Sequence, residues 1–122
     1  MKKKIVLIDD DPDILEGLKD ILLGEGYEVF CATDGIEGMD SIRDYNPDLI
    51  ITDIIMPEKD GITLMFDVRR EVPGVKTMVM SGGGRISAQK HLEVAKKIGV
   101  DKVIAKPFSS TAFLDAVQEL IG

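Results

Sequence analysis

Five short apolar segments, separated by stretches with helical spacing, constrain the fold of this chain more than any other feature. Each segment is nearly continuous in its apolar character, which is typical of parallel strands that are covered on both faces. Strands that alternate with helices along a chain indicate an open parallel sheet with helices on both sides. The expected strands are residues 4–8, 28–32, 77–80 and 102–105, together with the run 49–57, which carries Asp53 at the carboxyl end of its strand.

Five helices are expected around these strands. The first starts with Asp11 as its N-cap and Pro12 at the first helical position, a common helix start. The others are expected over residues 35–45, from 62 to before Pro73 after a turn at Asp60-Gly61, from about 92 to before Gly99, and after a cap at Ser109 or Ser110. The pattern predicts a doubly wound α/β fold with a five-stranded parallel sheet, formed by one domain over residues 1–122.

Composition limits the partners and the compartment. The net charge of −7 argues against a nucleic-acid-binding surface, because such surfaces need clustered lysine and arginine. Cys31 is the single cysteine, so no internal disulfide is expected and a reducing compartment is favoured. The sequence has neither an apolar run long enough to span a membrane nor a signal peptide. We therefore expect a cytoplasmic protein that binds neither nucleic acid nor membranes directly.

Polar side chains follow four of the expected strands at the points where the strands end. Asp9 and Asp10 follow the first strand, Asp53 ends the third, Ser81 follows the fourth and Lys106 follows the fifth. The carboxyl ends of parallel strands share one edge of the sheet, and ligands bind at that edge in open α/β sheets. These five side chains are therefore expected to form a common site.

The residue types at this edge favour magnesium and phosphoryl transfer. Carboxylates about 4 Å apart repel one another by roughly 1 to 4 kcal/mol per pair, so a cation between them is expected. Oxygen ligands without a His or Cys cluster favour Mg²⁺, and a lysine supplies a positive charge for an anion. A carboxylate can attack phosphorus directly, whereas Ser81 has no histidine in this set to activate it. Asp53 is thus the expected acceptor and Asp9 and Asp10 the expected metal ligands, while Asp11 serves as the helix cap.

These motifs resemble those of the receiver domains of response regulators in two-component signalling, over essentially the whole chain. Each motif alone is weak, but their order on successive strand ends is highly specific. The resemblance implies a flavodoxin-like fold of receiver type and a signalling domain rather than an enzyme. It rests on Asp9-Asp10, Asp53, Met56-Pro57, Asp60-Gly61, Ser81 and Lys106-Pro107-Phe108.

The resemblance also implies a donor and a division of roles. The donor would be a phosphohistidine of a sensor histidine kinase or a phosphotransfer protein. Mg²⁺ would be bound by Asp10, Asp53 and the main-chain carbonyl of Ile55, and Asp9 would act mostly through metal-bound water. Ser81 and Lys106 would hold the phosphoryl oxygens. Phosphorylation would switch a surface around the fourth helix and fifth strand, which would bind an output domain or partner protein.

One residue and one spacing depart from the family pattern, whereas a cis peptide bond is expected from it. The family usually has an aromatic residue three positions before the lysine, and this chain has Val103 there. Ser81 and Lys106 are 25 positions apart, a few more than expected, and the excess falls in residues 82–87, which we expect to be mobile because of Gly82 to Gly84. The Lys106-Pro107 peptide bond is expected to be cis by resemblance.

Four alternative interpretations compete with this one. A phosphatase of the haloacid-dehalogenase type would need a second Asp two residues after the nucleophile, where this chain has Ile55. A flavodoxin-like cofactor binder would need a hydroxyl- and glycine-rich loop after the first strand. The glycine run 82–84 lacks the Lys-Ser/Thr of a nucleotide-binding loop. A receiver-shaped interaction module that is never phosphorylated remains as the rival interpretation.

Since no output domain follows Gly122, a stand-alone receiver or a piece of a longer protein is expected.

Overall fold

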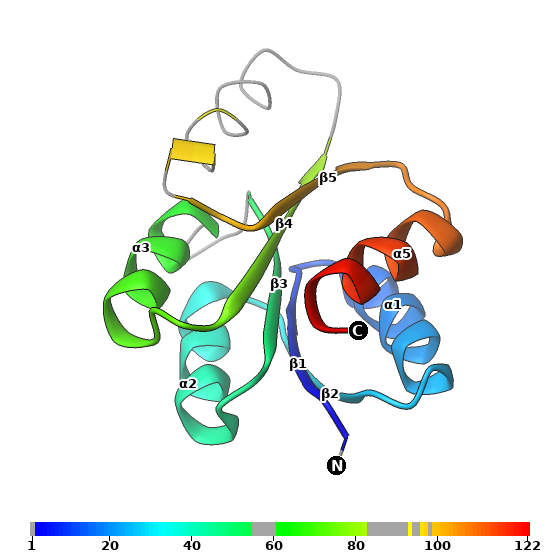
Figure 1. Cartoon of the computed structure of the whole chain (residues 1–122), viewed down its shortest axis with the longest axis horizontal. Helices are drawn as coiled ribbons and strands as arrows, with labels where there is room; N and C mark the ends of the chain where they lie inside the picture. The colour runs from blue at the N-terminus through cyan, green and yellow to red at the C-terminus, as the bar shows by residue number, and fades with distance from the viewer. Residues whose placement is uncertain (1, 55–60, 83–92, 94–95, 98) are drawn as a thin grey trace.

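Five parallel strands form one sheet in the order β2-β1-β3-β4-β5 (Figure 1). The structure is a computed structural model that describes residues 2–54, 61–82, 93, 96, 97 and 99–122. The doubly wound, flavodoxin-like fold predicted from the sequence is confirmed. The strands are β1 (Lys4–Ile8), β2 (Glu28–Ala32), β3 (Leu49–Asp53), β4 (Lys76–Gly82) and β5 (Lys102–Lys106), and the helices are α1 (Pro12–Gly24), α2 (Gly35–Tyr45), α3 (Gly61–Glu71) and α5 (Ser110–Ile121).

The helices cover both faces of the sheet, which explains why the strands are apolar at consecutive positions. Helices α1 and α5 lie on one face, and α2 and α3 lie on the other (Figure 1). In β1, Ile5 and Leu7 pack with α1 and α5, whereas Val6 and Ile8 pack with α2 and α3. All four side chains are completely buried. Because successive strand residues point to opposite faces, two covered faces require a strand without alternation.

Helix caps were largely predictable from the sequence. The Asp11 carboxylate accepts hydrogen bonds from the main-chain N–H groups of Asp13 at 3.0 Å and Ile14 at 3.4 Å, so it caps α1 as expected. Ser109 caps α5 by accepting a hydrogen bond from the N–H of Ala112 at 3.0 Å. The predicted helix before Gly99 and the predicted mobile segment 82–87 lie largely outside the described residues. None of the described helices is long and apolar enough to cross a membrane.

Two apolar residues in these helices, which helical spacing in the sequence would place on the buried faces, are not buried. Ile36 in α2 is 54% exposed and Phe66 in α3 is 55% exposed. Helical residues are about 100° apart around the axis, so Ile36 lies about 120° from Ile42, which is on the buried face. Phe66 is likewise rotated away from its buried neighbour Met65. The helices were predicted correctly, but these two positions do not belong to their buried faces.

Candidate functional site

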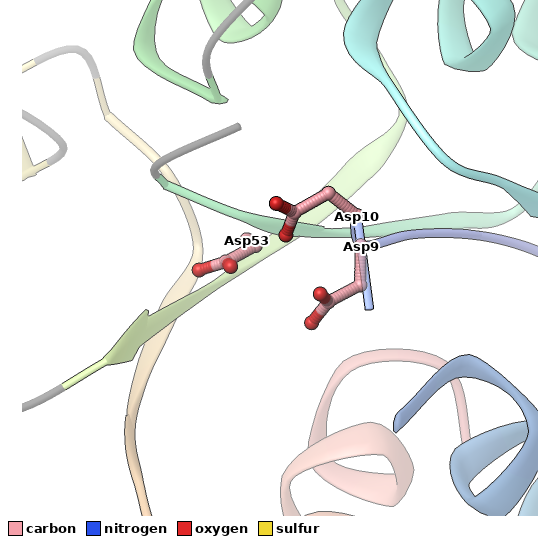
Figure 2. Close-up of side chains that lie close together, drawn as sticks. All are labelled: Asp9, Asp10 and Asp53. Carbon is pink, nitrogen blue, oxygen red and sulfur yellow. The ribbon is translucent and has the colours of Figure 1, made fainter. Parts of the chain in front are cut away.

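Three carboxylates meet where β1 and β3 end. The two strands are neighbours in the sheet, with Ile8 opposite Thr52, so the residues that follow are adjacent in space. One carboxylate oxygen from each of Asp9, Asp10 and Asp53 lies within 4.8 Å of the other two (Figure 2). The sheet topology thus brings together the three acids that the sequence assigned to a common edge. Their oxygens could bind one hard cation such as Mg²⁺.

Lys106 lies next to two of these carboxylates. Its Nζ is 2.9 Å from Oδ2 of Asp9 and 3.4 Å from Oδ2 of Asp53. The Asp9 side chain is only 1% exposed and that of Asp53 13%. Lys106 is the last residue of β5, the outermost strand of the sheet. Its side chain extends past β4 to the acids. It compensates part of the negative charge that would otherwise be buried without a partner.

The environment of Asp53 disfavours its charged form. Burial raises the pKa of the Asp53 carboxyl, and the charge of Asp9 raises it further, although Lys106 acts in the opposite direction. The pKa of Lys106 is also raised, since the hydrogen bond to Asp9 and the charge of Asp53 outweigh the lowering effect of its own burial. The site therefore holds a firmly protonated lysine beside an acid whose negative charge is poorly solvated.

The start of α1 fixes the position of Asp9. Its Oδ1 accepts a hydrogen bond from the main-chain N–H of Asp11 at 3.0 Å, while its Oδ2 bonds to Lys106. Asp11 itself is used as the helix cap. Asp10, which stands between Asp9 and Asp11 in the sequence, is exposed, so its carboxylate has access to solvent. Asp9 is thus the most constrained of the three acids and Asp10 the most accessible.

The remaining predicted site residues differ in how far the structure describes them. Ser81 is 3% exposed in β4 and lies opposite Ala105, one residue before Lys106. It lies one residue past Met80, the partner of Asp53 in the sheet. The expected cis peptide bond between Lys106 and Pro107 is present. Ile55, the expected source of a carbonyl ligand, lies outside the described residues.

Two further residues contact the main chain of Asp53 and were not assigned to the site from the sequence. The Thr52 hydroxyl donates a hydrogen bond to the carbonyl oxygen of Asp53 at 3.0 Å. Gly61, interpreted only as part of a turn and of the family motif, has its α-carbon directly against that carbonyl. A strand threonine carries no sequence signal for such a role. Gly61 is recognisable in the sequence as part of the family motif. Its contact with the carbonyl of Asp53, however, depends on how the chain folds back after β3.

Comparison with known proteins identifies the family. The sequence profile of the response regulator receiver domain matches residues 5–118. A CheY-like receiver domain protein from Methanospirillum hungatei is 30% identical, with a TM-score of 0.90, and the match covers 98% of this chain and 93% of that one. A receiver domain protein from Clostridium thermocellum is 26% identical, with a TM-score of 0.90 and coverage of 98% and 94%.

A longer protein also contains this fold. NtrX from Brucella abortus is 26% identical over 99% of this chain, with a TM-score of 0.88, but the match spans only 27% of the NtrX chain. The family match together with the fold defines the class: this chain belongs to the response regulator receiver domain family. It is a signalling domain of a two-component system, with an acidic pocket that could bind a metal.

Proposed function

We propose that this receiver domain accepts a phosphoryl group on Asp53 in a reaction that depends on Mg²⁺. The observation that carries the proposal is the cluster of Asp9, Asp10 and Asp53, with the Lys106 ammonium group in contact with two of its members. The donor is a phosphohistidine of a sensor histidine kinase or a phosphotransfer protein. The receiver domain that accepts the phosphoryl group comprises residues 1–122 and acts in the cytoplasm.

The chain's own groups have distinct tasks in this transfer. An oxygen of Asp53 attacks the phosphorus, a P–O bond forms, and the P–N bond to the donor histidine breaks, so that the imidazole leaves and an acyl phosphate remains. Lys106 is close enough to pair with an oxygen of the transferred group, and Ser81 supplies a hydroxyl for another. Mg²⁺ held by Asp10, Asp53 and the Ile55 carbonyl, with Asp9 bonded through water, would neutralise charge on the phosphoryl oxygens and align the donor.

The raised pKa of Asp53 supports its role as nucleophile. Burial is the main cause of the rise. A carboxylate that is poorly solvated is a stronger base and gives up less hydration when it attacks. Transfer moves the negative charge from the Asp53 carboxylate to the phosphoryl oxygens, which would be partners for Lys106 and for the cation. The same arrangement that disfavours the free carboxylate therefore favours its reaction.

An apolar groove next to the site is where we place the donor protein. The groove has a volume of about 380 Å³ and lies between α1 and residues 106–108, at the end of β5 and just after it. Lys106 lines it as well as touching Asp9 and Asp53, so a protein seated there would lie beside the acceptor. An amphipathic helix of the donor, which carries the phosphohistidine, matches such a groove. The other lining residues are Asp13, Ile14, Gly17, Leu18, Ile21, Pro107 and Phe108.

The surface that reports phosphorylation is proposed around β5 and the predicted fourth helix. Of these two elements, β5 lies among the described residues. Val103, which stands where the family usually has an aromatic residue, is half-buried in β5 opposite Val79. A valine has few χ1 rotamers and no ring that could swing toward Ser81. Signalling through this surface therefore has to rely on other residues than position 103.

Phosphorylation with a small donor tests the proposal directly. The protein is incubated with acetyl phosphate and Mg²⁺, and its intact mass is measured. We expect one added phosphoryl group that is stable in acid and lost in base. It should be absent from Asp53→Asn and absent when Mg²⁺ is chelated. Asp48→Asn, which changes a carboxylate at the opposite edge of the sheet, should label like the unchanged protein.

Labelling that persists in Asp53→Asn, or that ignores chelation of Mg²⁺, would contradict the proposal. Complete absence of labelling in the unchanged protein, from acetyl phosphate and from a phosphorylated donor protein alike, would favour an interaction module that is never phosphorylated. The groove is tested separately by methyl NMR. Adding a phosphotransfer protein should shift the methyl signals of Ile14, Leu18 and Ile21, and shifts confined to α2 and α3 would refute this docking site.

A further inference from the structure

The main-chain carbonyl of Asp53 is held from two sides by residues that do not belong to the acidic cluster. The Thr52 hydroxyl, which is completely buried, donates a hydrogen bond to this oxygen at 3.0 Å. Gly61, the first residue of α3, packs its α-carbon against the same oxygen. A residue of the acceptor strand and a residue of the following helix thus contact a single atom of the acceptor residue.

The contact at Gly61 leaves no room for a side chain. A β-carbon at this position would collide with the carbonyl oxygen of Asp53 and lie 2.9 Å from the α-carbon of Ile54. These neighbours are main-chain atoms, so they cannot turn aside as the end of a flexible side chain could. At Gly38, by contrast, the nearest atoms belong to the side chain of Ile8. Any residue larger than glycine at position 61 must therefore move the end of β3 or the start of α3.

Hydrogen bonds at both its N–H and its carbonyl fix Ile54, the residue that follows Asp53. The N–H of Ile54 donates to the carbonyl oxygen of Met80 in β4 at 3.0 Å, and the N–H of Gly61 donates to the carbonyl oxygen of Ile54 at 2.7 Å. The backbone that leaves the acceptor is therefore tied to the next strand and to the next helix. Since the carboxylate of Asp53 is attached to this backbone, its position depends on these ties.

We infer that Thr52 and Gly61 are positioning residues for phosphorylation, which together form a clamp on the main chain of Asp53. The inference rests on the proposed function of Asp53 as acceptor. The clamp sets where the Asp53 carboxylate stands relative to Asp10 and Lys106. Neither residue touches the phosphoryl group. Their effect is on the geometry of the attack, where a displacement of about 1 Å can lower a rate about 100-fold.

Substitutions at the two positions should have different sizes of effect. Gly61→Ala should lower the rate of phosphorylation by acetyl phosphate about 100-fold, because it displaces the acceptor backbone. Thr52→Val keeps the shape and the methyl group but removes the hydroxyl, and the loss of one neutral hydrogen bond should lower the rate about fivefold. Thr52→Ser keeps the hydroxyl and should retain most of the rate. A purely packing role for Thr52 would give the opposite order for Val and Ser.

Two controls separate positioning from general damage to the fold. Gly74→Ala adds a β-carbon in open space and should leave the rate unchanged. Val68→Ala removes buried methyl groups from α3, away from the carbonyl of Asp53, and should lower the melting temperature with little change in rate. The affinity for Mg²⁺, measured by NMR titration, should fall in Gly61→Ala and stay unchanged in Val68→Ala.

The outcomes distinguish this inference from the proposed function. If the unchanged protein is not phosphorylated, the proposed function fails, and the Mg²⁺ affinities alone then decide whether the clamp positions Asp53. If it is phosphorylated and both Gly61→Ala and Thr52→Val react at its rate, the clamp is refuted. If Gly61→Ala does not fold, the order of the Val and Ser variants at position 52 decides.

Discussion

Carboxylates at the two edges of the sheet are used in opposite ways. At the edge where the strands begin, Asp48 accepts a hydrogen bond from the N–H of Lys4 at 2.8 Å, and Asp101 accepts one from the N–H of Thr77 at 2.9 Å. At the edge where the strands end, three carboxylates stand within 4.8 Å of one another. The first arrangement joins neighbouring segments of chain, and the second places like charges together.

This difference separates stability from function within one fold. A carboxylate that receives main-chain N–H donors is satisfied without any ligand. Asp53, by contrast, is buried beside another acid, and its pKa is raised as a result. Lys106 compensates only part of the charge, so the strand-end site becomes more favourable when a cation is added. A change at the strand-start edge should therefore alter stability without altering phosphorylation, whereas a change at the strand-end edge should alter phosphorylation.

The largest effect on stability is expected at the strand-start edge. The Asp101 carboxylate accepts hydrogen bonds from both the N–H and the hydroxyl of the buried Thr77, at 2.9 and 3.2 Å. Asp101→Ala should lower the free energy of unfolding by about 2 kcal/mol, because it leaves a buried donor without its acceptor. Urea unfolding measures this change, while the rate of phosphorylation should stay the same. Asp101→Asn keeps an oxygen acceptor and should lose less, and an equal loss in both variants would contradict this explanation.

The fold and the acidic cluster could be predicted from the sequence. The fold followed from local signals, since the apolar runs, the Asp11-Pro12 helix start and the Ser109 cap each act over a few residues. The acidic cluster followed from one topological rule, because Asp9 and Asp53 end strands that a parallel sheet aligns at one edge. Both kinds of inference use residue type and position along the chain, which the sequence provides.

Features that depend on contacts between distant segments could not be predicted in this way. The side chain of Asp101 bonds to Thr77, 24 residues away, and the α-carbon of Gly61 meets the carbonyl of Asp53. Neither contact follows from residue type. The exposure of Ile36 and Phe66 shows the same limit, because helical spacing alone does not fix which apolar residues face the sheet.

The second largest effect concerns Mg²⁺ at the strand-end edge. At about ten times its dissociation constant, Mg²⁺ should raise the free energy of unfolding by about 1.4 kcal/mol, since it binds the folded chain. The increase should be smaller in Asp53→Asn and in Asp10→Asn, which lack one ligand charge, and unchanged in Asp48→Asn. Thermal unfolding with and without Mg²⁺ measures it. An equal increase in all four proteins would mean that Mg²⁺ binds elsewhere.

A smaller effect is expected from removing the charge of Asp53 without Mg²⁺. Asp53→Asn should raise the free energy of unfolding by about 1 kcal/mol at neutral pH, because it removes the repulsion with Asp9 and Asp10 and the burial of a charge. Lys106 keeps its partner Asp9 at 2.9 Å. The variant would thus lose phosphorylation and gain stability, which urea unfolding can measure. A loss of stability in Asp53→Asn would show that the contact between Lys106 and Asp53 outweighs the charge conflict.

The smallest effect is the dependence of that gain on pH. The folded pKa of Asp53 is raised above its unfolded value of about 3.9, so the folded protein binds this proton more readily than the unfolded chain. Its contribution to stability therefore falls as pH rises from the unfolded pKa to the folded pKa. The stability difference between Asp53→Asn and the unchanged protein should be largest at neutral pH and shrink as pH falls through the folded pKa.

Glu71, at the end of α3 that lies toward the strand-start edge, provides the opposite case. Two hydrogen bonds from Arg43, at 3.0 and 2.9 Å, lower the pKa of Glu71. Its contribution is therefore present above the unfolded pKa and is lost as pH falls through the folded pKa. Glu71→Gln should be less stable than the unchanged protein at neutral pH, and this difference should also shrink on acidification. Unfolding curves at several pH values should thus give differences of opposite sign for the two variants, and the same sign in both would overturn the contrast between the two edges.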